Sequence, residues 1–301
     1  MENTVERIKA LKKSKGALIL AHNYTISQVQ DVADFTGDSL ELAIRAKELQ
    51  APLLVFCGVS FMAETAKILS PSSTVLLPVP SAGCAMADMA TAQAVRAYRR
   101  EHPDTVIVAY VNTTASVKAE VDICCTSANA ERIVASIPSD KKILFLPDRN
   151  LGANVAKALG REMDLWPGYC PIHDALEKSV LEKARSLHPE AESMVHPECR
   201  PEVLESAHCA LSTGAMLRHL AKSEAKEYIV GTEEGILHRM QKENPGKSFY
   251  SVEPRLICED MKKITLEDVA ASLEKEQYKV ELPPELIRKA AAAIERMIAV
   301  K

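Results

Sequence analysis

The sequence has no excess of positive charge and no long apolar run. Its 37 basic and 41 acidic residues give a formal net charge of −4, so we expect no nucleic-acid partner. No stretch reaches the roughly 18 consecutive apolar residues of a membrane-spanning helix, so we expect no membrane association. The first 16 residues form a charged, helix-like stretch instead of the apolar core of a signal peptide. We therefore predict a cytoplasmic protein.

The cysteines lack the patterns that usually explain them. Eight are present, but without a secretion signal a disulfide framework is not expected. No Cys-x-x-Cys pair occurs, so a zinc knuckle or a thioredoxin-type site has no local support. We expect a reducing compartment, in which some thiols are buried and others can bind a metal.

What the sequence does contain is a threefold internal repeat. Hydrophobic residues make up 47% of the chain and charged residues 26%, which is ordinary for a globular protein with a buried core. Each third reads as helix, strand, helix, strand, helix, strand and a loop that holds a cysteine. The opening helices are predicted over residues 4–14, 91–102 and 174–188, and the first strands over 17–24, 106–113 and 192–199.

Chemically similar residues recur at matching places of the repeats. Polar residues 90 and 84 apart end the first strands: His22, Asn112 and His196. Hydroxyl residues 88 and 86 apart open the second helices: Ser39, Ser127 and Thr213. Cysteines 86 and 88 apart follow the third strands: Cys84, Cys170 and Cys258. This recurrence favours a true repeat over βα units that look alike only because all such units do.

These patterns predict an α/β fold of three pseudo-threefold-related units, each a small parallel sheet covered by helices on both faces. The units are assigned to residues 1–88, 89–173 and 174–263. Residues 264–301, a helix, a strand and a closing helix, are expected to complete the first unit. Ligands of such sheets bind beyond the carboxyl ends of the strands. Three units around one axis would bring three such ends, and one cysteine from each, to a common centre.

Three converging thiols can hold a metal in two ways. A zinc ion could bind all three and a water. A [4Fe-4S] cluster, which usually has four cysteine ligands, would instead keep one iron open to act as a Lewis acid. The alternative is that these cysteines are small buried apolar residues, which is the interpretation we adopt for the five that do not recur in phase: Cys57, Cys124, Cys125, Cys199 and Cys209.

The recurring hydroxyl and strand-end residues suggest an anion site with acid–base groups. Hydroxyls at helix starts can cap the helix, but they also mark places where backbone N–H groups and the helix dipole favour an anion. Three such ends at one centre would receive a substrate with several negative groups. Tyr24 and Glu198 each follow a strand-end histidine by two residues and share its side of an extended segment. Histidine, tyrosine and glutamate together supply an anion ligand, an acid and a base.

The motifs AHNYTISQVQDVADFTGDSLELA, AYVNTTASVKAEVD, TSANA, PDRNLG, HPEC and STGAM, together with the three lone cysteines, resemble those of the quinolinate synthase family. The resemblance runs from about residue 16 to residue 298. It implies three pseudo-equivalent αβα domains around a central [4Fe-4S] cluster. It also implies an enzyme of NAD biosynthesis, which condenses iminoaspartate with dihydroxyacetone phosphate to quinolinate and releases phosphate and water. An iminoaspartate-producing enzyme would be a partner.

The resemblance implies roles for the residues that match these motifs. Cys84, Cys170 and Cys258 would hold three irons, and the fourth would bind substrate. Tyr24 and Glu198 would transfer protons, with His22 and His196 beside them in the catalytic centre. The carboxylate and phosphate groups of the substrates would be bound at His22, Ser39, Tyr110, Val111, Asn112, Ser127, His196, Pro197, Glu198 and Thr213.

Two departures from the family pattern and two competing functions remain. Tyr169 stands where the family leads us to expect histidine, and Cys258 is followed by Glu259 instead of the extra cysteines of longer members, which indicates a short form. An iron–sulfur redox sensor could use the same three ligands, but it would leave the hydroxyls and strand-end histidines unexplained. A zinc-dependent lyase or hydrolase is the other alternative. His173, three residues after Cys170, is expected near the metal without an assigned role.

Overall fold

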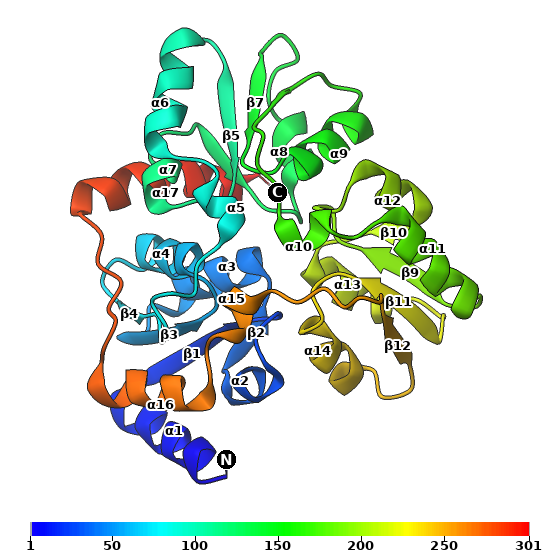
Figure 1. The fold of residues 1–301 in the computed structure, drawn as a ribbon. Coiled ribbons are helices and arrows are strands. Elements are labelled where there is room, and N and C mark those ends of the chain that lie inside the picture. The colour runs from blue at the N-terminus through cyan, green and yellow to red at the C-terminus, as the bar shows by residue number, and fades with distance from the viewer. Residues whose placement is uncertain (1, 301) are drawn as a thin grey trace.

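Three lobes surround a common centre in this computed structural model, which describes residues 2–300 (Figure 1). Each lobe contains one four-stranded sheet, and the first strand along the chain lies second in each. All strand pairs within the sheets are parallel. The predicted α/β fold of three small parallel sheets is therefore confirmed.

The sheets use the same strand order in all three lobes. The first is β2 (Phe35–Gly37), β1 (Ala17–His22), β3 (Leu53–Cys57) and β4 (Thr74–Leu76). The second is β6 (Ile123–Cys125), β5 (Val106–Tyr110), β7 (Ile143–Leu146) and β8 (Asp164–Leu165). The third is β10 (Cys209–Ala210), β9 (Glu192–Val195), β11 (Glu227–Gly231) and β12 (Ser248–Ser251).

Five helices accompany each sheet in the described residues. The first lobe has α1 (Glu2–Lys15), α2 (Ser27–Val32), α3 (Ser39–Leu49), α4 (Ser60–Leu69) and α5 (Ala85–Asp88). The second has α6 (Ala92–Glu101), α7 (Ala115–Lys118), α8 (Ala130–Ala135), α9 (Arg149–Leu159) and α10 (Pro171–Asp174). The third has α11 (Lys178–Leu187), α12 (Pro201–Ser206), α13 (Thr213–Leu220), α14 (Ile236–Glu243) and α15 (Glu259–Lys262). Two C-terminal helices follow, α16 (Leu266–Lys275) and α17 (Pro284–Ala299).

The central strands form because their sequences are continuous apolar runs. Every residue of β3 and of β7 is buried, as expected for parallel strands covered on both faces. The helices contribute one apolar face each, and α6 buries only Val95 of its ten residues. None of the helices within residues 2–300 is long and apolar enough to cross a membrane.

Three local expectations differ from the structure. The edge strands β2, β6 and β10 were not predicted, because two or three residues carry too little pattern to be recognised. The strand expected before residue 283 is reduced to one antiparallel bridge between Leu76 and Lys279. The opening helix of the third unit begins at Lys178 instead of residue 174, because α10 occupies the preceding residues.

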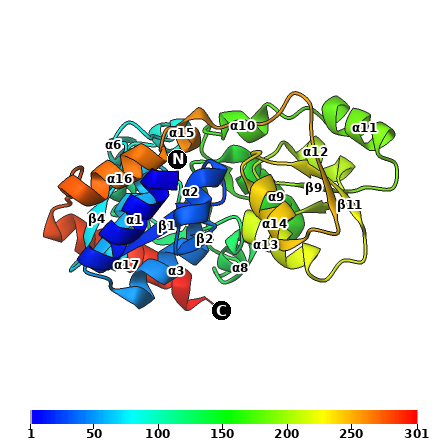
Figure 2. The same ribbon diagram turned by 90° about the horizontal axis from the view of Figure 1, so that it is seen from below.

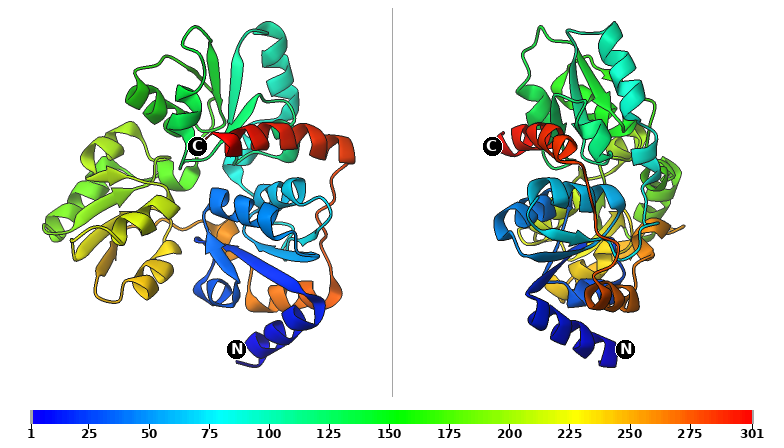
Figure 3. Two further views of the ribbon diagram at one scale, coloured as in Figure 1. Left: turned by 180° about the vertical axis from the view of Figure 1, so that it is seen from behind. Right: turned by 90° about the vertical axis from the view of Figure 1, so that its left-hand side faces the viewer.

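The C-terminal helices are shared between two lobes. Helix α16 packs against α1 and β3 of the first lobe, and Figure 2 shows α1 and α16 side by side. Helix α17 crosses to the second lobe and packs against α7 and β6 (Figure 3). Residues 264–301 were expected to complete the first unit. Helix α16 lies on that lobe, whereas α17 places its apolar face mainly against the second lobe and also contacts α4 of the first.

Candidate active site

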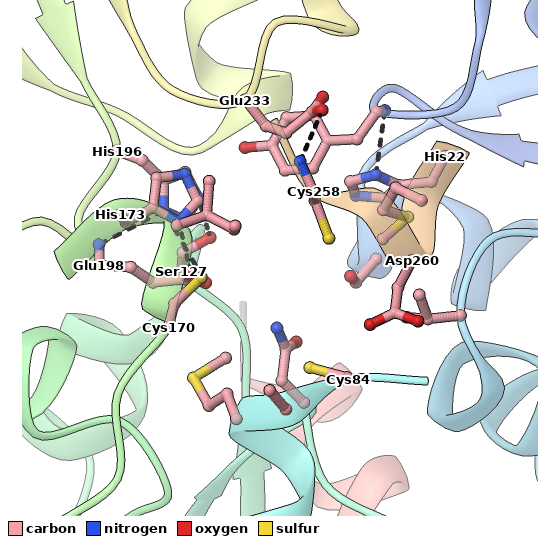
Figure 4. A pocket seen from close by; sticks show the side chains of 18 of the residues that line it. His22, Cys84, Ser127, Cys170, His173, His196, Glu198, Glu233, Cys258 and Asp260 are labelled. Carbon is pink, nitrogen blue, oxygen red and sulfur yellow. Dashed lines mark hydrogen bonds and ion pairs between the residues drawn. The ribbon is translucent and has the colours of Figure 1, made fainter. Parts of the chain in front are cut away.

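The carboxyl ends of the three first strands face one cavity of about 360 Å³ between the lobes. Its lining includes the three phase-matched cysteines, the two strand-end histidines and the three hydroxyl residues of the repeat. Figure 4 shows Cys84, Cys170 and Cys258 reaching it from three separate lobes. A parallel sheet places its ligand site at this edge, and the threefold arrangement combines three such sites into one central cavity.

Each of the three cysteines directly precedes a four-residue helix, α5, α10 or α15. Backbone N–H groups of these helices act to lower the pKa values of the thiols: those of Met86 and Ala87 for Cys84, of His173 for Cys170, and of Asp260 and Met261 for Cys258. Burial nevertheless raises the pKa of Cys84 to about 12 and raises the pKa values of the other two thiols. Buried thiols whose ionised form is favoured by backbone N–H groups are suited to ionise when they bind a cation.

The three sulfurs are not spaced for a single metal ion in this structure. Among the described residues, the three Sγ atoms do not all lie within 4.8 Å of one another. A single tetrahedral zinc ion, with Zn–S distances of about 2.3 Å, would need them closer than that. A group with several metal atoms would not need the sulfurs so close, because each cysteine would then bind a different atom.

Within residues 2–300, two other groups of side chains could hold an ion. One is Cys170, His173 and Glu198 in the cavity wall, but both ring nitrogens of His173 already have hydrogen-bond partners. The other is Glu192, Cys209 and His219. Cys209 does not line the cavity, so it is separate from the three-cysteine site, as its position out of phase with the repeat predicts.

The three recurring hydroxyl residues are not the caps of their helices. Helix α3 is capped by Asp38 and helix α13 by Ser212, so Ser39 and Thr213 are the first helical residues instead of the caps. Ser127 lies three residues before α8, which begins at Ala130, so the expectation that it opens the helix is wrong. All three hydroxyl residues line the cavity, and capping does not explain them.

The hydrogen bonds correct the alignment of the strand ends by two residues. The Tyr24 N–H donates to Nδ1 of His22 (3.2 Å), as the Glu198 N–H does to Nδ1 of His196 (3.3 Å). In the second lobe Tyr110 ends the strand and Asn112 follows it by two. Asn112 is therefore the counterpart of Tyr24 and Glu198, not of the histidines.

A continuous chain of hydrogen bonds joins groups from all three lobes. Tyr110 donates its hydroxyl proton to Oε1 of Glu198 (2.5 Å), and Oε2 of Glu198 lies 2.7 Å from Nδ1 of His173. Nε2 of His173 lies 2.8 Å from the hydroxyl of Thr232, which is 2.5 Å from the hydroxyl of Tyr24. The two predicted proton carriers, Tyr24 and Glu198, are thus connected through His173 and Thr232.

Burial and neighbouring groups set the charge states of the two strand-end histidines and of the carboxylate and phenols in this chain. It lowers the pKa of His22 and of His196 to about 3, so both rings are neutral near pH 7. Burial also acts to raise the pKa of Glu198, but the neighbouring His196 and His173 and the Tyr110 hydroxyl outweigh it and hold that pKa well below its usual range. Burial raises the pKa of Tyr24 and of Tyr110 well above the ordinary value. The hydrogen-bonded chain therefore holds one carboxylate, that of Glu198, between two protonated phenols.

Some functional residues gave no signal in the sequence. Thr232 follows β11 and carries no recognisable motif. Glu233, which lines the cavity, accepts hydrogen bonds from the Cys258 N–H (3.1 Å) and from Lys262 (2.7 Å for the ion pair). Lys262 also donates to the carbonyl of Tyr24 (2.7 Å). Glu233 and Lys262 thus connect Cys258 to the end of the first strand. These residues lie too far apart in the sequence for a local pattern to predict the contact.

Three residues singled out from the sequence lie outside the cavity lining. Val111 and Pro197 are absent from the lining, and both present backbone carbonyls to side chains behind the cavity. Tyr169 stacks under the guanidinium of Arg149, whose Cζ is 4.4 Å from the ring centroid. Asn112 does line the cavity, and its buried Oδ1 has no hydrogen-bond partner in the described part of the chain.

Three α/β lobes converging on one cavity with buried acid–base groups define an enzyme that acts on a small molecule. Residues 6–299 match the family described as Quinolinate synthetase A protein. Relatives named quinolinate synthase include those of Desulforudis audaxviator, 48% identical over 99% of this chain and 98% of the relative, and Dehalococcoides mccartyi strain 195, 50% identical over 98% and 97%. A relative in Thermus thermophilus is 47% identical over 99% and 98%. The chain belongs to the quinolinate synthetase A family.

Proposed function

We propose that this protein condenses iminoaspartate with dihydroxyacetone phosphate to form quinolinate in NAD biosynthesis, with phosphate and water released. The observation that carries the proposal is the meeting of three phase-matched cysteines and a buried acid–base chain in one cavity. Cys84, Cys170 and Cys258 would hold a [4Fe-4S] cluster, whose iron without a cysteine ligand supplies Lewis-acid chemistry. An iminoaspartate-producing enzyme would supply the first substrate.

Neutral groups would bind the negative charges of the substrates. No lysine or arginine is among the described residues that line the cavity. Ser39 and Thr213 instead stand in the first turns of α3 and α13, where free N–H groups and the helix dipole attract carboxylate and phosphate. The unpaired Oδ1 of Asn112 would accept a hydrogen bond from the substrate, for example from an imine N–H or a hydroxyl.

Glu198 and the two tyrosines would move protons. The reaction removes protons from carbon and nitrogen and delivers protons to departing hydroxyls. Glu198 is the only carboxylate in the hydrogen-bonded chain, so it is the base. Tyr24 and Tyr110 stay protonated because burial raises their pKa values, so each can donate a hydrogen bond or a proton to oxygen.

Turnover by anaerobically purified protein is the direct test of the proposed function. Protein with a full complement of iron and sulfide, supplied with dihydroxyacetone phosphate and freshly generated iminoaspartate, should form quinolinate, measured by chromatography. Each quinolinate should be accompanied by one inorganic phosphate. Iron-replete protein that forms no quinolinate, yet binds and releases electrons reversibly, would instead support the redox-sensor alternative.

Replacing Thr213 with valine should weaken substrate binding while the protein stays folded. The Thr213 hydroxyl accepts a hydrogen bond from Nδ2 of buried Asn23 (3.1 Å) and lines the cavity. A lost hydrogen bond to a charged group costs about 1.5–3 kcal/mol, so KM should rise about 10- to 100-fold. Thr91 caps α6 away from the cavity, so Thr91→Val is the control that loses a hydroxyl but keeps KM. An unchanged KM for Thr213→Val would remove this residue from the binding site.

A further inference from the structure

In the first lobe a glutamine holds the backbone on both sides of Tyr24. Nε2 of Gln30 donates to the carbonyl of Asn23 (3.0 Å) and to that of Thr25 (2.8 Å). Gln30 is buried, whereas the central Tyr24 lines the cavity. Tyr24 lies in a turn that the Thr25 N–H closes onto the carbonyl of His22 (3.0 Å), and one donor behind this turn holds both flanking carbonyls.

The second lobe repeats this contact with a lysine. Nζ of Lys118 donates to the carbonyl of Val111 (2.7 Å) and to that of Thr113, on the two sides of Asn112. The side chain is 0% exposed, and burial lowers the pKa of its ammonium to about 8. A buried charge is costly. This ammonium contacts the two carbonyls and lies 5.4 Å from the centre of the Phe61 ring, and the charge of Glu64 acts to raise its pKa. Because burying this ammonium costs free energy, we expect its contact with the two carbonyls to have a role.

In the third lobe an asparagine makes the equivalent contact. Nδ2 of Asn154 donates to the carbonyl of Pro197 (2.9 Å) and to that of Cys199 (3.0 Å), on the two sides of Glu198. Asn154 belongs to α9 of the second lobe, so this contact crosses between lobes. We call the three arrangements, centred on Gln30, Lys118 and Asn154, the carbonyl clamps.

The donors of the three clamps do not all come from the same position of the repeat. Gln30 and Lys118 are 88 residues apart, the same distance that separates the strand ends His22 and Tyr110. The equivalent position 86 residues further on is Leu204, which cannot donate a hydrogen bond. The third lobe obtains its donor from a helix of its neighbour instead. Three different side chains therefore make one contact around three residues that line the cavity.

We propose that Gln30, Lys118 and Asn154 are positioning residues, one for each lobe, which fix Tyr24, Asn112 and Glu198 in the cavity. The inference rests on the proposed function for the role of each central residue, but not for the contacts. Each clamp holds the peptide on both sides of one side chain, so that side chain projects into the cavity at a fixed angle. Losing a clamp should then reproduce, in weaker form, the loss of the residue at its centre.

Replacing Lys118 with methionine tests the second clamp, because methionine has similar length and no donor. The dissociation constant of quinolinate, measured by calorimetry on cluster-replete enzyme, should rise about tenfold with iron content unchanged. Lys118→Gln, which introduces the donor of the first lobe, should recover part of the affinity. In an Asn112→Ala background the methionine change should add little, since the residue being positioned is gone. Lys47→Met, on the exposed face of α3, is the matched control.

A second readout keeps the test independent of the proposed function. Hydrogen–deuterium exchange of peptides covering residues 110–114 should accelerate in Lys118→Met and remain unchanged in Lys47→Met, whether or not the protein binds quinolinate. Unchanged exchange, or a loss of affinity that adds fully to that of Asn112→Ala, would overturn the second clamp. If Lys118→Met does not fold, Asn154→Leu on half-buried α9 takes its place. That variant should lower turnover and leave KM unchanged, because Glu198 is its central residue, and normal turnover would overturn the clamps.

Discussion

Glu198→Gln should lower turnover by about 10²- to 10⁴-fold, the range for the loss of positioned proton transfer. The carboxylate accepts one hydrogen bond from Tyr110 and one from His173, on its two oxygens. Glutamine keeps the shape but has only one oxygen, so its amide N–H₂ must face one of these partners. The substitution removes the base and at the same time reverses part of the hydrogen-bonded chain.

The reversal has a specific direction. If the amide donates to Nδ1 of His173, the imidazole proton moves to Nε2, which must then donate to Thr232. Thr232 in turn donates to Tyr24, whose proton becomes free to point elsewhere. Selective ¹⁵N labelling of histidine reports this change of tautomer at His173 apart from any effect on rate. Turnover should be measured by rapid quench on protein with full iron content.

A matched control separates the cavity carboxylate from the general loss of a negative charge. Glu202 is exposed on α12, four residues from Glu198, so Glu202→Gln should retain full turnover. Near-normal turnover in Glu198→Gln would leave the proposed mechanism without its base. A large loss that is accompanied by lost iron would instead assign Glu198 a role in holding the metal site together.

Changing any one of Cys84, Cys170 or Cys258 to serine should abolish the bound cluster and with it all turnover. The wild-type protein should contain about four iron and four sulfide per chain. The three cysteines occupy the same place before a short helix in each lobe, and serine is a poor ligand for these soft sites. Iron, sulfide and visible absorption of anaerobic protein are the measurements.

Cys209→Ser is the control for this series. Cys209 is half-buried, lies outside the cavity lining and is out of phase with the repeat, so the variant should keep its iron, its colour and its activity. A Cys209→Ser protein without iron, or a Cys258→Ser protein with four irons, would overturn the ligand assignment. Exposure of the wild type to air should remove iron and activity together, because an iron without a protein ligand is readily lost.

The sequence predicted the parts of the site that repeat, because a repeated residue is recognised by its period. The cysteines, the strand-end histidines and the hydroxyls were found in this way, and all of them line the cavity. The period was also the source of an error, because Asn112 was aligned with His22 by residue type. The hydroxyls of Thr25 and Thr113 donate to the carbonyls of His22 and Tyr110, which pairs Tyr110 with His22 instead.

Contacts between lobes could not be predicted in this way. Thr232 joins Tyr24 to His173 across 208 and 59 residues of sequence, and Asn154 reaches Pro197 across 43. Within the described residues, neither contact has a counterpart at the same position of another repeat. The short strands β2, β6 and β10 were missed for a different reason: their pairing depends on the neighbouring first strand and not on their own two or three residues.

The positions of the three cysteines along the chain have a thermodynamic consequence. Each cysteine follows the last strand of one lobe, just before the chain leaves that lobe. After Cys258 the chain returns to the first lobe as α16. A group bound by all three would cross-link residues 86 and 88 apart and restrict the unfolded chain as two disulfides do. In the loop-entropy account each closure of this length is worth roughly 4–5 kcal/mol. Occupancy of the centre would then determine whether the three lobes unfold together or one at a time.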